Sequence, residues 1–164
     1  TYKDLTIEVV EHGYDKINGN PNNDNPDKKK NKKFNIAFIG YITEEKGLKY
    51  LEELTDKVKG TDTNIHLFGQ TTNKKCNKNK TNYVYHGKYI QQDLPNLLLE
   101  NDIKLICLLS MWPETYSYTL SESLISEIPV ISFDLGAIAE RVKKADLYER
   151  LISGCNTRHA MLFY

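Results

Sequence analysis

Residues 112–122 read WPETYSYTLSE and separate two apolar runs, residues 104–110 and 128–133. This order predicts a buried strand, a polar turn, a short helix and a second strand. A helix that begins at the end of a buried strand directs backbone N–H groups beyond the sheet, where they favour an anion such as a phosphate. Glu114 in the turn and Glu122 in the helix are suited to accept hydrogen bonds from sugar or ribose hydroxyls. The segment therefore offers both chemistries that a nucleotide sugar needs.

The same alternation of short apolar runs and amphipathic segments extends along the chain from Phe34. Strands are predicted at residues 34–39, 64–68, 83–86, 104–109 and 129–133, and helices at residues 45–59, 92–101, 118–127 and 137–152. Such alternation favours an α/β fold with a doubly wound, Rossmann-like parallel sheet covered by helices on both faces. In this architecture, ligands bind beyond the carboxyl ends of the strands.

A known family shares the motifs around the two carboxylates. Glu114 and Glu122 form a Glu-x7-Glu pair, and residues 129–137 read Pro-Val-Ile-x-x-Asp-x-Gly-Ala. Together with residues 36–40 and 66–69, these motifs resemble the donor-binding C-terminal half of family 4 retaining glycosyltransferases, which have the two-domain architecture called GT-B. The resemblance covers residues 34–145 and implies one half of that architecture.

The resemblance assigns roles to residues of the central segment. Glu122 would accept hydrogen bonds from the ribose hydroxyls of the donor, and Glu114 would contact the transferred sugar as a catalytic residue. Backbone N–H groups of Ser117, Tyr118 and Thr119 would face the sugar and the diphosphate. Without the resemblance, Glu122 reads as a solvated helix glutamate and Glu114 as a carboxylate that stabilises the turn.

Further donor contacts are expected at the ends of the first three core strands. Gly40 permits a sharp turn, and Lys46, in the first turn of the expected helix, opposes the helix dipole but suits a diphosphate. Lys46 is therefore the second catalytic candidate, whereas Tyr41 occupies a position where the family usually has arginine. Gly69 would lie near the nucleotide, or it marks only a tight turn. Tyr89 would pack on the base, or it is an ordinary surface tyrosine.

Composition limits the remaining possibilities. The 22 basic and 22 acidic side chains balance, so no net field favours nucleic acid or an anionic membrane. Lysine runs at residues 28–33 and 74–80 are mixed with asparagine and lack aromatics that stack on bases, which is typical of solvated loops. There is no apolar stretch long enough for a transmembrane segment. The three cysteines have no metal-ligand spacing, and no Asp-x-Asp motif occurs, so we expect neither a metal nor a cofactor besides the donor.

The length suits one domain with its own core. We divide the chain into an opening strand and flexible linker (residues 1–33), a nucleotide-sugar-binding domain (residues 34–153) and a tail (residues 154–164) that matches nothing in the family. Enzymes of this architecture bind their saccharide or lipid-linked acceptor through an N-terminal domain. That domain is expected to be missing here, so the chain alone would be an incomplete enzyme.

The sequence thus predicts the donor domain of a hexosyltransferase-type enzyme, with a cytoplasmic location suited to free cysteines. From the commonness of such enzymes we expect a role in polysaccharide biosynthesis, with contact to the inner membrane face through the rest of the protein. A non-catalytic nucleotide-sugar-binding or scaffolding module is the main alternative, and an epimerase or phosphorylase on the same fold is another. The sequence does not specify the base, the sugar or the acceptor.

Overall fold

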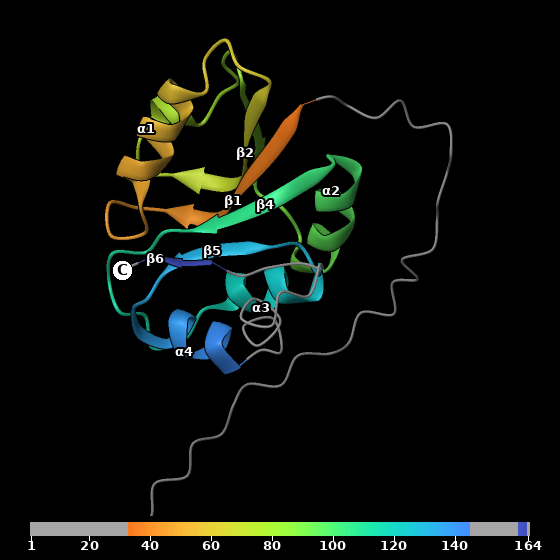
Figure 1. The fold of residues 1–164 in the computed structure, drawn as a ribbon. Coiled ribbons are helices and arrows are strands. Elements are labelled where there is room, and N and C mark those ends of the chain that lie inside the picture. Colours follow the sequence, from red (N-terminus) through yellow and green to blue (C-terminus); the bar gives the residue numbers. More distant parts are fainter. Residues whose placement is uncertain (1–32, 145–160, 164) are drawn as a thin grey trace, which may run out of the picture.

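The computed structural model describes residues 33–144 and 161–163 (Figure 1). The strands are β1 (Phe34–Ile42), β2 (Thr63–Thr71), β3 (Tyr83–Gly87), β4 (Ile103–Leu108), β5 (Val130–Phe133) and β6 (Met161–Phe163). The helices are α1 (Leu48–Lys57), α2 (Leu94–Glu100), α3 (Tyr118–Ile125) and α4 (Gly136–Lys144), with short 3-10 turns η1 (Lys74–Cys76) and η2 (Gln91–Asp93).

The strands form one sheet in the order β3-β2-β1-β4-β5-β6, and all neighbouring strands are parallel. This is the order of a doubly wound nucleotide-binding sheet, and it confirms the predicted fold class. The direction of winding reverses between β1 and β4. The loops that leave these two strands therefore turn toward opposite faces, and a crevice opens at their carboxyl ends.

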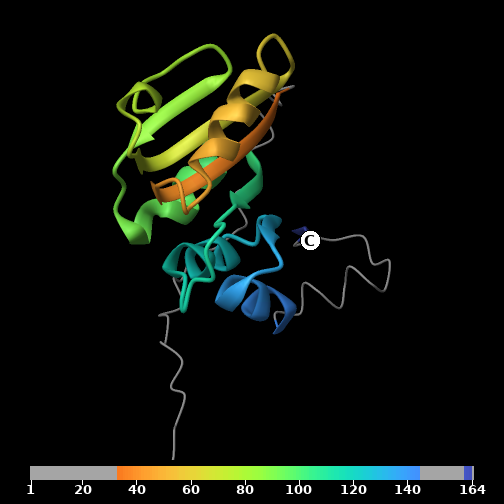
Figure 2. The same cartoon turned by 90° about the vertical axis from the view of Figure 1, so that its left-hand side faces the viewer.

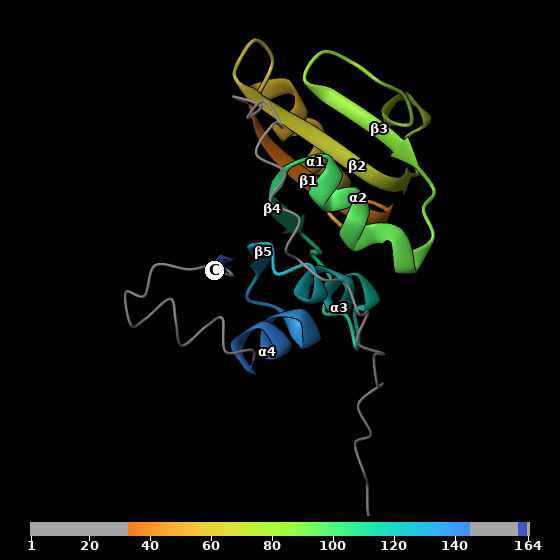
Figure 3. The same ribbon diagram turned by 90° about the vertical axis from the view of Figure 1, so that its right-hand side faces the viewer.

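Two apolar layers pack against the two faces of the sheet. Side chains alternate along β1, so Ile36 and Phe38 pack with α1, whereas Ala37 and Ile39 pack with α2, α3 and α4. Figures 2 and 3 show α1 and α2 on opposite sides of β1 and β2. The inner strands β1, β2 and β4 have buried side chains toward both faces, which explains why they read as continuous apolar runs in the sequence.

The strands β1 and β2 each end three residues later than predicted, so Gly40, Tyr41 and Gly69 lie within strands, and the first helix starts three residues later than predicted. Residues 44–47 form turns instead of helix, and α1 begins at Leu48 because Gly47 adopts the left-handed conformation, with φ of 83°. The carbonyl of Thr43 accepts hydrogen bonds from the N–H groups of Lys46 and Leu48. Lys46 therefore lies in the turn before the helix.

Parts of the predicted organisation lie outside the described residues. These are the opening strand and linker of residues 1–32 and the continuation of the last helix beyond Lys144. Strand β6 falls within the segment that we named a tail, and it extends the sheet beside β5. Within the described part of the chain, no helix is long and apolar enough to cross a membrane.

The buried His66 of β2 contacts the half-buried His86 of β3. His66 Nδ1 lies 3.0 Å from His86 Nε2, and the His86 ring stacks on Phe68 with centroids 4.1 Å apart. His66 is 5% exposed, and its Nε2 atom has no hydrogen-bond partner among residues 33–144 and 161–163. Burial lowers the pKa of His66 to about 4, with a further contribution from His86, and burial also lowers the pKa of His86.

The histidine pair predicts acid sensitivity of the fold. Unfolded His66 takes up a proton as the pH falls below its ordinary pKa of 6.5, whereas folded His66 does so only near 4. Protons therefore favour the unfolded state between these values, and stability should fall as the pH is lowered. We expect the chain to lose about 2 kcal/mol more unfolding free energy than the variant His66→Leu between about pH 7 and about pH 5. Urea unfolding at the two pH values measures this, and an equal loss in both proteins would contradict it.

Candidate functional site

The candidate site is a pocket at the carboxyl ends of β1 and β4, where the winding of the sheet reverses. Its walls come from the ends of these strands, the loops that follow them, the first turn of α3 and one residue of α4. The polar and loop residues that line it are Tyr41, Lys46, Leu109, Ser110, Glu114 and Thr119. The pocket thus combines segments that lie far apart in the sequence.

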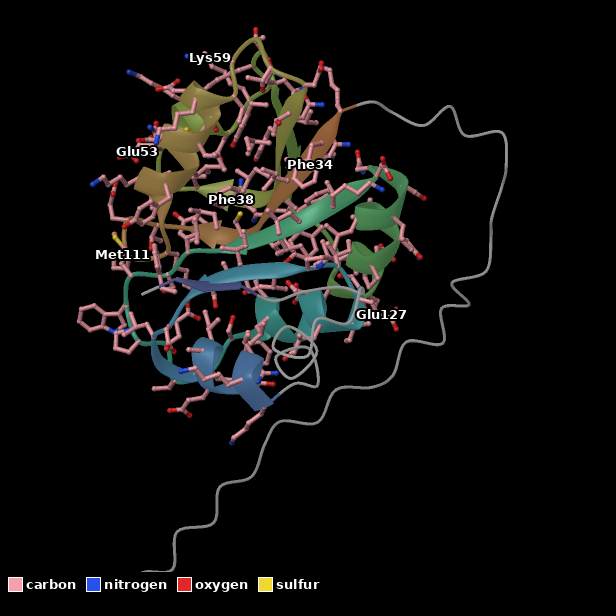
Figure 4. All side chains as sticks on the ribbon, viewed as in Figure 1. Phe34, Phe38, Glu53, Lys59, Met111 and Glu127 are labelled. Carbon is pink, nitrogen blue, oxygen red and sulfur yellow. The ribbon has the colours of Figure 1, made fainter. Side chains whose placement is uncertain are left out.

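The loop after β1 and the loop after β4 are fastened to each other through their backbones. The carbonyl of Glu45 accepts hydrogen bonds from the N–H of Met111 at 2.7 Å and from the Ser110 hydroxyl at 3.3 Å. A Cβ atom at Gly47 would lie 2.3 Å from the carbonyl oxygen of Leu109, so only glycine allows this approach. Figure 4 shows Met111 beside the turn that precedes α1.

The loop that carries Glu114 is held on its other side by α4. The N–H of Ala137 donates to the carbonyl of Glu114 at 2.9 Å. Gly136 has φ of 60°, and a Cβ atom there would lie 2.8 Å from the Cα atom of Pro113. Glu114 is therefore fixed between the turn before α1 and the start of α4.

These contacts bring together the two predicted catalytic residues. Lys46 Nζ lies 3.6 Å from Glu114 Oε1, and the side chains are 48% and 15% exposed, respectively. An ammonium group at this position can pair with a phosphate, and the carboxylate can accept hydrogen bonds from sugar hydroxyls. The pair places both functions at the mouth of one pocket.

The amino end of α3 forms another wall of the site. Ser117 is the N-cap, and its hydroxyl accepts a hydrogen bond from the N–H of Leu120 at 3.3 Å. Its hydroxyl also lies 3.0 Å from that of Thr119. A Cβ atom at Gly40 would lie 3.0 Å from the Thr119 methyl group, so the end of β1 lies against α3. The Ser117 side chain caps the helix, while Tyr118 and Thr119 supply its first turn beside the pocket.

Arg141 of α4 supports the start of α3, a role that the sequence did not predict. Its guanidinium group donates to the Ser117 carbonyl at 2.8 Å and to the Ser121 hydroxyl at 2.7 Å, and it lies 4.5 Å from the centroid of the Tyr116 ring. It therefore ties α4 to the start of α3 and adds a positive charge there. The sequence offered no signal for this contact, because these partners lie 20 or more positions earlier in the chain.

Glu122 lies within α3 and is only 6% exposed. The hydroxyl of Tyr89 donates a hydrogen bond of 2.8 Å to Glu122 Oε2. The burial of Glu122 excludes the alternative that it is a solvated helix glutamate. Tyr89 is half-buried against the core, and the expectation that its ring packs on a nucleotide base stays a prediction.

Gly69 and Tyr41 have clear structural positions at the same edge of the sheet. Gly69 pairs with Gly40 in register, and a Cβ atom at Gly69 would lie 1.9 Å from the Gly40 carbonyl oxygen. Gly69 thus allows two strand ends to approach closely, whereas Tyr41 is 56% exposed beside the pocket. Their contacts with a donor stay predictions. Among residues 33–144 and 161–163, no group of His, Cys, Asp or Glu side chains is placed to hold a metal ion.

Comparisons with known proteins agree with this architecture. The family described as "Glycosyl transferases group 1" matches residues 20–160. A curated relative from Klebsiella pneumoniae, "Uncharacterized 41.2 kDa protein in cps region", is 28% identical over 109 residues, which are 66% of this chain and 30% of that protein.

Two solved structures of Anabaena Alr3699/HepE have the same fold. The complex with UDP-glucose has a TM-score of 0.56 and 15% identity, and the match covers 80% of this chain and 35% of that one. The complex with UDP and glucose has a TM-score of 0.52 and 16% identity, over 68% of this chain and 32% of that one. The chain thus spans about a third of the length of these proteins.

The close packing of the two loops predicts an unequal response to two glycine substitutions. Gly47→Ala meets both a left-handed backbone and the Leu109 carbonyl. At Gly60 the backbone is also left-handed, but no atom of the described residues lies within 4 Å of an added Cβ atom. We expect Gly60→Ala to lower the unfolding free energy by about 1 kcal/mol and Gly47→Ala by about 3 kcal/mol or more. Urea unfolding of both variants measures the difference. Equal losses would show that the loops are free to separate.

Proposed function

This chain belongs to the group 1 glycosyl transferases, and from this premise we propose that it binds a nucleotide-diphosphate sugar as the donor domain for retaining transfer to an acceptor. The observation that carries the proposal is the meeting of Lys46 and Glu114, 3.6 Å apart, at the switch point of the sheet. Two loops separated by three strands, two α-helices and more than 60 residues of sequence converge there with the amino end of α3.

In the proposed complex, the diphosphate lies between Lys46 and the start of α3. Negative charge grows on the diphosphate oxygens as the bond to the sugar breaks. The ammonium of Lys46 and the amino end of the helix stabilise that charge more strongly in the transition state than in the bound donor. Lys46 is half-exposed on a flexible stem, so it can turn from Glu114 to a phosphate.

The two glutamates fix the donor at its two ends. Glu114 accepts hydrogen bonds from hydroxyls of the transferred sugar and holds its anomeric carbon in line for reaction. Glu122 accepts hydrogen bonds from the ribose, where an ionised acceptor and a vicinal diol form two charge-assisted bonds. No side chain of this proposal requires a metal ion.

The whole enzyme would include a second, N-terminal domain that binds a saccharide or lipid-linked acceptor. Two observations support this second domain: the two-domain architecture of the family, and the match of this chain to only 30% of the length of its curated relative. We propose that the chain alone binds donor weakly and transfers sugar slowly or not at all. The cps-region name of the relative supports a place in polysaccharide biosynthesis, and a hexosyl donor and a cytoplasmic location are part of the same proposal.

A non-catalytic nucleotide-sugar-binding module is the second candidate. Tyr41 favours it, because a tyrosine at this position supplies no positive charge to a diphosphate. The two candidates differ in one observable property of the longer protein that contains this domain. Transfer of sugar to an acceptor supports the enzyme, whereas donor binding without any turnover supports the module.

Glu122 provides the first test of the proposal. Calorimetric titration of the chain with UDP, GDP, ADP and CMP should show binding of one nucleotide. Because the ribose loses its ionised acceptor, Glu122→Ala should weaken that binding about tenfold or more. Glu100→Ala, at an exposed position on α2, serves as the matched control and should bind like the parent chain. If no nucleotide binds to the chain or to the longer protein, the proposal fails.

Lys46 provides an independent test of the diphosphate position. Lys46→Met keeps the unbranched stem of the side chain and removes the charged ammonium group. We expect it to weaken binding of the nucleoside diphosphate about tenfold and to leave binding of the corresponding monophosphate nearly unchanged. Lys49→Met, an exposed lysine on α1, is the control. Calorimetry with UDP and UMP, or with the pair of whichever base binds, measures this. An equal loss for both nucleotides would remove Lys46 from the diphosphate site.

A further inference from the structure

We propose that Tyr89 positions the carboxylate of Glu122 and thereby sets how strongly this domain prefers a ribonucleotide donor to its 2′-deoxy counterpart. This inference rests on the proposed function, because it assumes that Glu122 binds the ribose. It concerns a residue that touches no reacting atom and acts through Glu122. The sequence suggested a different role for Tyr89, as a surface that packs on the base.

The hydrogen bond joins two elements that are distant in the sequence. Tyr89 follows β3 directly, after Gly87 turns the chain with φ of 76°. Its ring packs against the apolar cluster that contains Phe68 and Leu120. Its hydroxyl lies 2.8 Å from Oε2 of Glu122, which is 33 residues later in the chain.

Both partners are suited to a positioning role. A tyrosine ring has two side-chain torsions, and here packing against the core restricts it. Glu122 has three side-chain torsions, so each hydrogen bond to its carboxylate narrows the orientations that the group can take. The hydrogen bond from Tyr89 holds one oxygen of the carboxylate in place and so restricts the orientation of the group. It also supplies a donor to a charged group that is 6% exposed and therefore has little contact with water.

Orientation matters because a vicinal diol presents its two hydroxyls at a fixed spacing. A carboxylate has about four acceptor positions on two oxygens, so the bond from Tyr89 leaves capacity for the diol. A carboxylate that is held in one plane can accept from both hydroxyls at once, and little entropy is lost on binding. When the carboxylate is free to rotate, each hydroxyl contributes less. The benefit of the 2′-hydroxyl should therefore depend on Tyr89.

The experiment compares ribonucleotides with 2′-deoxyribonucleotides. UDP, GDP and ADP and their three 2′-deoxy forms are titrated into the whole chain, its Tyr89→Phe variant and its Tyr85→Phe variant. The last is the matched control, because Tyr85 is another partly buried tyrosine of β3 that packs in the opposite cluster. For the base that binds, we expect the chain to prefer the ribonucleotide about tenfold, and Tyr89→Phe to prefer it only about two- to threefold. Tyr85→Phe should keep the full preference.

A double-mutant cycle separates positioning from general loss of structure. If Tyr89 acts through Glu122, adding Tyr89→Phe to Glu122→Ala should change the affinity for the ribonucleotide by less than about twofold. Loss of local structure would weaken binding again in that background. Circular dichroism and thermal unfolding show whether each variant is folded.

The outcomes distinguish this inference from the proposed function. An unchanged preference in Tyr89→Phe overturns the positioning role and leaves the donor-domain proposal standing. No preference in the parent chain overturns the positioning role and also the ribose role of Glu122, while nucleotide binding itself still supports a donor domain. A further loss of affinity in the double variant also overturns the positioning role. If neither the parent chain nor the longer protein binds any of the three nucleoside diphosphates, the proposed function and this inference both fail.

Discussion

The close backbone contact between Gly47 and Leu109 is the constraint on which the candidate site depends. A side chain at Gly47 would lie 2.3 Å from the Leu109 carbonyl oxygen, so glycine is required where the turn before α1 meets the loop after β4. The hydrogen bond from the N–H of Met111 to the carbonyl of Glu45 fixes the same junction. Lys46 lies between Glu45 and Gly47 in the chain, and its position beside Glu114 follows from this junction. The parallel sheet alone would leave the two loops apart. The contacts between Gly47 and Leu109 and between Met111 and Glu45 bring the loops together into one site.

The positive charges at this edge of the sheet differ in how firmly they are held. Arg141 makes two hydrogen bonds at 2.7 and 2.8 Å and lies over the Tyr116 ring, so its position is fixed by the fold. Its planar group suits such a bridge between helices. Lys46 is half-exposed and makes one ion pair at 3.6 Å. The first charge supports the start of α3, and the second can follow a ligand. Because different residues carry these two charges, the start of α3 can stay rigid while Lys46 moves to an anion in the pocket.

The sequence predicted the fold class and strand positions well because a parallel sheet that is buried on both faces leaves continuous apolar runs. It also predicted that Lys46 and Glu114 would share a site, since both follow strands that meet at the switch point. It misplaced the start of the first helix, because Gly47 in a left-handed conformation delays it to Leu48. The contacts of Arg141, Tyr89 and the histidine pair were not foreseen. Each joins side chains across elements, and their geometry depends on strand register and helix placement, which periodicity does not encode. The roles of the site residues toward a donor stay predictions.

The pairing of Lys46 with Glu114 bears on how easily a donor can enter. An ion pair between side chains that are partly open to solvent contributes only about 0–1 kcal/mol. Its separation by a diphosphate therefore costs little, while it holds both side chains near their working positions before the donor arrives. Glu114 is the more buried partner, at 15% exposure, so it would keep its place when Lys46 turns away. Sugar hydroxyls that replace the ammonium then give this carboxylate new donors. The same two groups can thus neutralise each other in the empty pocket and divide between sugar and diphosphate in the filled one, without movement of the backbone that holds them.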